Sequence, residues 1–215
     1  MKILKINKED FNGVIKKIIK LINQEKIIVF PTDTVYGLIG NAKSKTVVKR
    51  IFKIKKRFFQ KPIPIFVKDL KMAKRLVRIN KTQEEILKEF WPGKLTIVLR
   101  AKSTPKWWSR LGVLSKERKI GLRIPNYKIL NILLKKINFP LTATSANISG
   151  KKATTKIKEV LNQFKNKKSQ PDLIVDAGDL EPSLPSTVID LETLEILREG
   201  AISKKEILDK IKLCK

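Results

Sequence analysis

Residues 27–38 read Ile-Ile-Val-Phe-Pro-Thr-Asp-Thr-Val-Tyr-Gly-Leu, and this stretch decides the fold class. Its first four residues are apolar and predict a short buried strand, which Pro31 ends. Two threonines, an aspartate and a tyrosine follow directly. Because ligands of α/β proteins bind beyond strand ends, these polar residues mark a candidate site. On composition alone, a turn whose hydroxyls bond to their own backbone is a slightly better interpretation than a site. As an ordered string of eight residues, however, the segment is a far more specific signal.

Strands and helices alternate along the rest of the chain. Apolar spacing predicts a helix capped by Asn7 with its core face over 11–22, a last helix capped by Ser203, and helices over residues 45–54, 70–77, 82–90, 128–136 and 154–164. Apolar runs predict strands over residues 63–67, 95–99, 120–124, 141–144, 173–175, 187–191 and 195–197. This alternation indicates an α/β fold with one domain over residues 1–215, and the hairpin-like end favours a single mixed sheet with flanking helices.

The composition limits the chemistry. The chain has no histidine, and its one cysteine is Cys214, which excludes histidine-dependent hydrolases, thiolate zinc cages and intramolecular disulfides. The formal net charge is +28, from 48 Lys and Arg against 20 Asp and Glu. This charge favours acidic partners such as RNA or nucleotides, but scattered lysines on solvated faces explain it equally well. Neither a signal peptide nor an apolar membrane span is present, so we expect a cytoplasmic protein.

Two further segments carry candidate chemistry. Lys55-Lys56-Arg57, with Lys61 after it, places several cations where a helix is expected to end. Such a cluster suits the helix dipole, and it also suits a triphosphate. Residues 142–150 read Thr-Ala-Thr-Ser-Ala-Asn-Ile-Ser-Gly, and Ser145 and Asn147 can donate to phosphate or carboxylate oxygens. The chain has neither the P-loop pattern nor the dinucleotide-binding glycine pattern, so ATP would have to bind by another arrangement.

Several ordered strings resemble the YrdC-like family of threonylcarbamoyl-AMP synthases. They are PTDTVYGL (31–38), K-x-R with K-P (55–57 and 61–62), W-P-G-x-x-T (91–96), G-x-R-x-P (121–125), T-S-A-N-x-S-G (144–150), S-T-V-I-D (186–190) and L-R-E-G (197–200). The resemblance runs over about residues 24–200 and corresponds to the short form of the family. It implies a twisted mixed α/β sheet around a concave, basic groove.

The resemblance also implies a reaction and its partners. ATP, L-threonine and bicarbonate or carbon dioxide would give threonylcarbamoyl-AMP and pyrophosphate, and a separate downstream complex would transfer the threonylcarbamoyl group to tRNA. Mg²⁺ is expected on the triphosphate, without a protein metal site. Weak RNA or tRNA binding is expected from the charge, and no membrane partner. The alternatives are an RNA-binding module without catalysis and a paralogue that acts on another substrate or acceptor.

The same resemblance assigns roles to individual residues. The implied catalytic residues are Lys55, Arg57, Ser145 and Asn147. The implied ATP-binding residues are Arg57, Lys61, Ser145 and Arg198. The implied threonine-binding residues are Thr34, Tyr36, Arg123 and Ser186, with Tyr36 as a wall of the site.

The chain departs from the family pattern at a few positions. The family often has K-G-R-P where this chain has Lys55-Lys56-Arg57-Phe58, so we expect a stiffer or differently aimed loop. Some relatives have a histidine near the position of Phe66 that contacts threonine. In this chain that contact would have to be apolar. Trp91 is expected in the core, and Trp107 and Trp108 in a loop.

Overall fold

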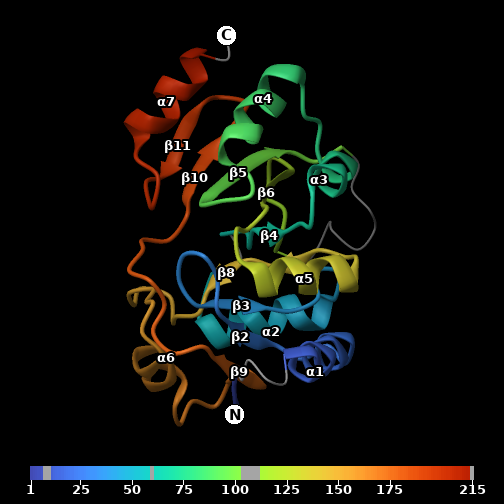
Figure 1. The fold of residues 1–215 in the computed structure, drawn as a ribbon, viewed down its shortest axis with the longest axis vertical. Coiled ribbons are helices and arrows are strands. Elements are labelled where there is room, and N and C mark those ends of the chain that lie inside the picture. The colour runs from blue at the N-terminus through green and yellow to red at the C-terminus, as the bar shows by residue number, and fades with distance from the viewer. Residues whose placement is uncertain (7–10, 59–60, 103–111, 214–215) are drawn as a thin grey trace.

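The computed structural model describes residues 1–6, 11–58, 61–102 and 112–213, and its strands form two sheets that follow one another along the long axis of the molecule (Figure 1). The chain begins beside the lower sheet of Figure 1, and the last helix lies at the opposite end. Asn7, Trp107, Trp108 and Cys214 lie outside the described residues.

The lower sheet contains the strand that was predicted at the start of residues 27–38. Its strand order is β1-β9-β2-β3-β8. Strands β1 and β2 both pair in parallel with β9, whereas β3 pairs antiparallel with β2 and β8. The bounds are β1 Lys2–Lys5, β2 Ile28–Phe30, β3 Gly37–Ile39, β8 Thr144–Ser145 and β9 Leu173–Asp176.

The upper sheet is also mixed, with the order β11-β10-β5-β6-β4-β7. Its parallel pairs are β10 with β5 and β4 with β6, and its other pairs are antiparallel. The predicted hairpin at the chain's end is confirmed as β10 and β11. The bounds are β4 Ile65–Phe66, β5 Leu95–Arg100, β6 Lys119–Arg123, β7 Leu141–Thr142, β10 Thr187–Asp190 and β11 Glu195–Arg198.

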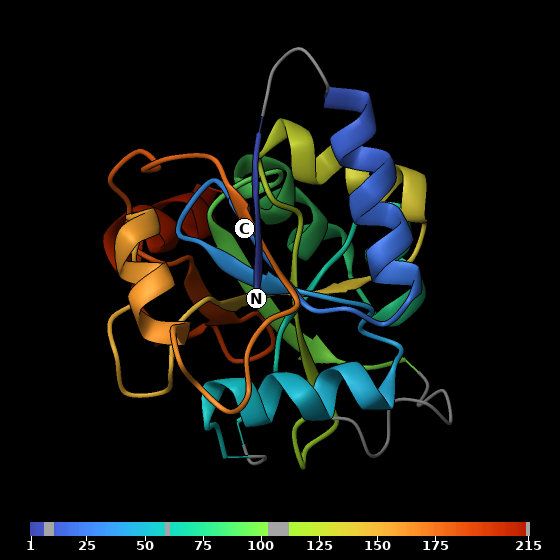
Figure 2. The same ribbon diagram turned by 90° about the horizontal axis from the view of Figure 1, so that it is seen from below.

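The helices lie within a few residues of their predicted positions. Helices α1 and α5 lie side by side (Figure 2) and pack Ile18, Ile22, Leu130 and Leu133 into one hydrophobic cluster. The predicted cap of the last helix is confirmed, because the Glu206 backbone N–H donates to Ser203 Oγ at 3.2 Å. No helix among the described residues is long and apolar enough to cross a membrane. The bounds are α1 Phe11–Asn23, α2 Lys45–Lys55, α3 Leu70–Leu76, α4 Lys81–Phe90, α5 Lys128–Ile137, α6 Ile157–Phe164 and α7 Lys204–Leu213.

The predicted α/β class with mixed pairing is confirmed, but the strands divide between two sheets instead of forming one. The predicted strand 141–144 explains the division, since it is two strands with a break at Ala143. Strand β7 pairs with β4 in the upper sheet, and β8 pairs with β3 in the lower one. At the break, the Ala143 backbone N–H donates to the Pro64 carbonyl at 2.8 Å. This short segment therefore joins the two sheets.

The larger hydrophobic cluster runs through both sheets and packs the upper sheet against its helices. It includes Leu95, Ile97 and Leu122 from the strands and Leu87 from α4, all nearly fully buried. Trp91 belongs to it at 8% exposure, so its predicted core position is confirmed. With the strands held from behind by this core, their opposite side chains are free to line a site.

Candidate active site

Both sheets contribute to a pocket of about 830 Å³. The turn after β2 and strand β8 supply one part of its wall, and the upper sheet supplies the other. The residues that carry polar or charged groups into it are Thr32, Thr34, Arg57, Lys61, Thr96, Ser115, Glu117, Lys119, Arg123, Thr144, Ser145, Ser186, Asp190 and Arg198. The predicted strand-end location of the site is therefore where the structure has a pocket.

Strand alternation supplies the floor of the pocket. Side chains at alternate positions face the same side of a sheet. Lys119, Gly121 and Arg123 of β6 accordingly all line the pocket, while Leu122 between them is buried in the core. Glycine at position 121 makes room for Pro64, which packs against it: a Cβ added at Gly121 would lie only 3.0 Å from the Pro64 Cβ.

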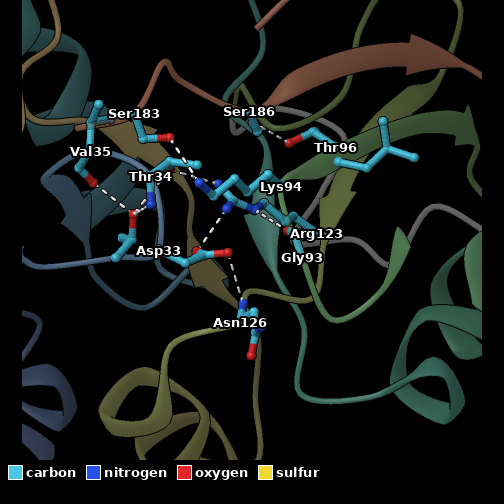
Figure 3. A network of polar contacts seen from close by, with 12 residues as sticks. Asp33, Thr34, Val35, Gly93, Lys94, Thr96, Arg123, Asn126, Ser183 and Ser186 are labelled. Carbon is cyan, nitrogen blue, oxygen red and sulfur yellow. Dashed lines mark hydrogen bonds and ion pairs between the residues drawn. The ribbon is translucent and has the colours of Figure 1, made fainter. Parts of the chain in front are cut away.

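Arg123 is the centre of the polar network in Figure 3. Its guanidinium donates from Nε to the Gly93 carbonyl at 2.8 Å and from Nη1 to Thr34 Oγ1 at 3.1 Å. It also forms an ion pair from Nη2 to Asp33 Oδ1 at 2.7 Å. The ring of Phe66 lies 5.9 Å from the guanidinium carbon. Burial lowers the pKa of Arg123, and the charge of Asp33 opposes that shift, so the ion pair keeps a buried cation in place.

The hydroxyl of Thr34 has a defined orientation. Thr32 Oγ1 donates its single proton to the Val35 carbonyl at 2.7 Å. The 3.1 Å contact between the two threonine hydroxyls therefore has Thr34 as donor. Since Arg123 also donates to Thr34 Oγ1, this oxygen is fixed on the pocket wall. The turn alternative is thus partly correct: the hydroxyls do satisfy the turn, and they line the pocket as well.

Ser186 and Arg198 form a second polar group on the wall. Ser186 Oγ lies 2.8 Å from Thr96 Oγ1, and Arg198 Nη2 donates to Ser186 Oγ at 3.3 Å and to its carbonyl at 2.6 Å. Gly200 allows this arrangement, because a Cβ there would lie 2.1 Å from the Pro185 carbonyl oxygen. Desolvation lowers the pKa of Arg198, and the positive charges of Arg123 and Arg57 lower it further.

Arg57 enters the pocket from the end of α2. Its Nε donates to the Lys61 carbonyl at 2.8 Å and its Nη2 to the Pro62 carbonyl at 2.9 Å. The segment after the helix is thereby held against the guanidinium, and Lys61 lines the same pocket. Burial lowers the pKa of Arg57, because desolvation disfavours its charged form.

Lys55 lies behind the wall and not in it. Its side chain is buried at 2% exposure and is not among the lining residues. Its Nζ donates to the carbonyls of Ser145 and Asn147 and, at 2.9 Å, to Asn147 Oδ1. Desolvation, and then the nearby charge of Arg57, lower the pKa of Lys55 to about 7. The geometry gives Lys55 the task of holding the Ser145–Asn147 loop.

Asn147 is also behind the wall. Its Oδ1 accepts from Lys55 and, at 2.6 Å, from Ser145 Oγ. Its Nδ2 donates to the carbonyls of Ile148 and Lys151. Every hydrogen-bonding atom of the amide therefore has a partner in the protein, and Ser145 is the member of this loop that reaches the pocket.

The predicted wall position of Tyr36 is wrong. The Tyr36 side chain is buried at 1% exposure and points away from the lining. Its hydroxyl donates to the Gly178 carbonyl at 2.6 Å and accepts from the Ala177 backbone N–H at 3.1 Å. Burial raises its pKa to about 12. Its neighbours Val35 and Gly37 line the pocket instead.

The remaining predicted site residues converge on the pocket, while their chemical roles stay predictions. These are Thr34, Arg57, Lys61, Arg123, Ser145, Ser186 and Arg198. The sequence assigns no role to Asp33 or Thr96, although both stand inside the ordered strings of the family. Lys119 and Asp190, which form an ion pair on the lining, were also missed. Alternation from Arg123 back along β6 could have indicated Lys119.

Comparison with known proteins identifies the family. Residues 20–200 match the family model Sua5_yciO_yrdC, described as telomere recombination. The chain belongs to the Sua5/YciO/YrdC family. Membership in this family confirms the resemblance inferred from the ordered strings.

Two curated relatives extend this assignment of the Sua5/YciO/YrdC family. A protein of Methanocaldococcus jannaschii, named provisionally as a threonylcarbamoyl-AMP synthase, is 36% identical over 205 residues, which are 94% of this chain and 93% of that protein. The threonylcarbamoyl-AMP synthase of Pyrococcus abyssi is 35% identical over 190 residues, which are 86% of this chain and 54% of that protein. The chain thus spans about half the length of the second relative.

Solved structures of the Sua5/YciO/YrdC family share the fold. The crystal structure of P. abyssi Sua5 complexed with L-threonine has a TM-score of 0.85 and 32% identity, and the match covers 98% of this chain and 61% of that chain. The crystal structure of E. coli YciO has a TM-score of 0.81 and 26% identity, with coverage of 96% and 98%. The mixed α/β fold is therefore the fold of this family.

Lys56 explains one departure from the Sua5/YciO/YrdC pattern. It caps α2 with φ of 50°, in the left-handed region, and its backbone N–H donates to the Phe52 and Lys53 carbonyls. Glycine adopts this conformation at little cost, which accounts for the glycine of the K-G-R-P pattern. Lysine is strained in this region, so the cap carries a local energetic cost.

Lys56→Gly is expected to raise the free energy of unfolding by about 1 kcal/mol, because the left-handed strain exceeds the entropy that glycine adds to the unfolded chain. The melting temperature should rise by roughly 2–4 °C. Asn138→Gly is the matched control, since Asn138 caps α5 with φ of 58° and asparagine tolerates this region better. A gain at Asn138 equal to that at Lys56 would contradict the strain at Lys56.

Proposed function

We propose that this chain is a threonylcarbamoyl-AMP synthase, which joins ATP, L-threonine and bicarbonate or carbon dioxide and releases pyrophosphate. The chief support is the pocket wall, where Arg57, Lys61, Arg123 and Arg198 lie with a set of oriented hydroxyls. The names of the curated relatives carry the same activity, including a relative matched over nearly its whole length. These names agree with the reaction that the resemblance implies, which makes the chain a nucleotidyltransferase.

The amino-acid substrate fits the part of the pocket around Arg123. A guanidinium recognises a carboxylate through two parallel hydrogen bonds. Thr34 and Ser186 supply hydroxyls on the same wall, and the Phe66 ring gives an apolar surface there. The solved Sua5 relative with L-threonine is consistent with a threonine site in this fold.

The triphosphate fits the part of the pocket around Arg57, Lys61 and Arg198. Phosphate oxygens carry negative charge that increases on the leaving pyrophosphate during transfer. Fixed cations in a partly desolvated site stabilise that charge without having to reorganise. Ser145 adds a hydroxyl to this wall, held in place by Asn147 and Lys55.

The proposed reaction needs positioning more than a protein base. The threonine amine adds to carbon dioxide and loses a proton, which gives a carbamate. A carbamate oxygen then attacks the α-phosphorus of ATP in line, and the bond to the β-phosphate oxygen breaks. Pyrophosphate leaves with the bonding electrons, and threonylcarbamoyl-AMP keeps the new P–O bond. Alignment of the two substrates supplies much of the rate, which suits a chain without histidine.

Magnesium is proposed to enter with ATP as part of the substrate. Among the described residues no group of three His, Cys, Asp or Glu side chains is placed to hold a metal ion. The carboxylate of Asp190 on the lining is already paired with Lys119. Oxygens of the triphosphate are therefore the natural ligands for the ion. Delivery of the product to a tRNA-modifying complex, and weak binding of tRNA itself, belong to the same proposal.

Pyrophosphate release from ATP is expected to require both L-threonine and bicarbonate, because the proposed nucleophile is their carbamate. The measurement is a pyrophosphate-release assay with each substrate left out in turn. Equal release with L-serine, or without any amino acid, would indicate a paralogue that acts on another substrate. Absence of turnover together with RNA binding that persists at high salt would indicate a binding module.

A further inference from the structure

The cations of the pocket differ in whether a carboxylate compensates them. Arg123 forms an ion pair with Asp33, with side-chain exposures of 5% and 9%. Among the ion pairs of the described residues, none involves Arg57, Lys61 or Arg198. Lys119, on the same lining, is likewise paired with Asp190 and Glu192. The pocket therefore has two compensated cations, Arg123 and Lys119, and three that face it without a partner carboxylate.

The pairing still leaves Arg123 able to bind a ligand. A guanidinium has five N–H donors. Arg123 uses Nε, one N–H of Nη1 and one N–H of Nη2 for Gly93, Thr34 and Asp33. One N–H therefore remains on each terminal nitrogen, and these two donors form the fork to which we assign the ligand's carboxylate. Including Asp33, the net charge around this fork is zero.

Asp33 acts from outside the pocket. It is not one of the lining residues, although Thr32 and Thr34 on either side of it are. Its second carboxylate oxygen accepts from the Asn126 backbone N–H at 3.0 Å, so both oxygens are fixed (Figure 3). Any effect of Asp33 on a ligand must therefore pass through the orientation and charge of Arg123.

Arg57, Lys61 and Arg198 line the pocket without a carboxylate partner among the described residues, so their part of it has excess positive charge. Desolvation, and after it the positive charges of Arg123 and Arg57, lower the pKa of Arg198 on this lining. An anion of high charge relieves this repulsion when it binds. A zwitterion, whose net charge is zero, does not.

We propose that Asp33 divides the pocket between its two substrates: by pairing with Arg123 it keeps that end neutral and selective for the zwitterionic amino acid, and it leaves the triphosphate to Arg57, Lys61 and Arg198. Asp33 is thus a positioning residue that sets ligand specificity by charge. This inference rests on the proposed function for the identity of the two substrates. The division of charge itself can be tested with simple ions.

The decisive variant is Asp33→Asn. The amide cannot accept from both Arg123 and the Asn126 N–H, and it removes the negative charge. Calorimetric titration should then show weaker L-threonine binding, by about tenfold or more, because the oriented fork is lost. The same variant should gain an additional site for inorganic phosphate at the freed Arg123. In turnover, phosphate should become competitive with L-threonine, whereas in the wild type it competes with ATP.

Asp172→Asn is a matched control. Asp172 also pairs with an arginine, Arg50 at 3.1 Å, and also accepts a backbone N–H, from Ile27 at 2.8 Å, but neither member of the pair lines the pocket. Asp172→Asn should change the melting temperature without changing the binding of L-threonine or of inorganic phosphate. The double variant Asp33→Asn with Arg123→Met should lose the additional phosphate site again. Should Asp33→Asn not fold, Asp33→Ser carries the same comparison.

The outcomes separate the inference from the proposed function. An unchanged number of phosphate sites in Asp33→Asn overturns the division of charge, whether or not threonine binding falls. Gain of the phosphate site supports it, even in a protein that releases no pyrophosphate with L-threonine. In that case the proposed function fails and the zwitterion that binds is a different amino acid.

Discussion

Lys55→Met is expected to destabilise the protein by about 3 kcal/mol at pH 9, because the buried acceptors around Nζ lose the amine that donates to them. These are the carbonyls of Ser145 and Asn147 and the amide oxygen of Asn147. The melting temperature should fall by roughly 6–12 °C. Threonine-dependent pyrophosphate release should fall too, since the loop no longer holds Ser145 on the pocket wall. Thermal melts beside turnover at a permissive temperature measure both effects.

The cost of Lys55→Met should depend on pH. The pKa of Lys55 is about 7 in the folded protein and is that of an ordinary lysine in the unfolded chain. Unfolding therefore takes up a proton between these values, and the wild type gains stability as pH rises from about 7 toward 10.5. The variant lacks this gain, so its deficit should be smaller at pH 6 than at pH 9. A deficit independent of pH would mean that folding does not shift the pKa of Lys55.

Lys53→Met is the control for this variant. Lys53 is on the same helix and is exposed, so the substitution should change stability by no more than about 0.5 kcal/mol. A similar loss in both variants would mean that the hydrogen bonds of Lys55 do not contribute to stability.

Arg57→Ala is expected to slow turnover on the order of a hundredfold, equivalent to roughly 3 kcal/mol in the barrier. Arg57 is proposed to stabilise charge on the phosphates as pyrophosphate leaves, and this stabilisation is greatest in the transition state. Arg57→Lys should recover part of the rate, because an ammonium cannot reproduce the planar fork. The measurement is threonine-dependent pyrophosphate release, with thermal melts of each variant.

Two comparisons sharpen the Arg57 experiment. Arg50→Ala removes a guanidinium from the same helix, one that is paired with Asp172 and does not line the pocket. It should leave turnover unchanged. Asn147→Ala should lower turnover through the loss of its contacts to Ser145 and Lys55, and it should lower the melting temperature as well. Near wild-type rates in Arg57→Ala and Asn147→Ala would show that the reaction occurs elsewhere on the protein.

The sequence predicts most of the elements because their signals are local. Helix α2 follows from apolar spacing, and residues 27–38 place polar groups directly after a strand. Strand β1 could not be found in this way, since it forms only by pairing with β9, more than 160 residues later. Gly37–Ile39 has too short a pattern to distinguish a strand from the continuation of a turn. Such elements depend on partners that are remote in the chain.

The site shows the same limit at the level of side chains. Lys55 shares a helix face with the buried residues Val48, Ile51 and Phe52, which was a signal that it is buried. Its partners in the 145–147 loop could not be derived from that face. Tyr36 has a hydroxyl suited to a site, but strand alternation and a remote carbonyl at Gly178 place it elsewhere. Residue type predicts chemistry more reliably than it predicts orientation.

The break at Ala143 has a consequence for anyone who wants to redesign this pocket. Strand β7 is registered in one sheet and β8 in the other, with a single residue between them. Inserting or deleting a residue there would misalign one sheet or turn Ser145 away from the wall. The number of residues in this segment therefore cannot be changed without loss of the site. Ala143 itself lines the pocket. Substrate range is therefore best altered by side-chain volume at this position, with the scaffold left at its present length.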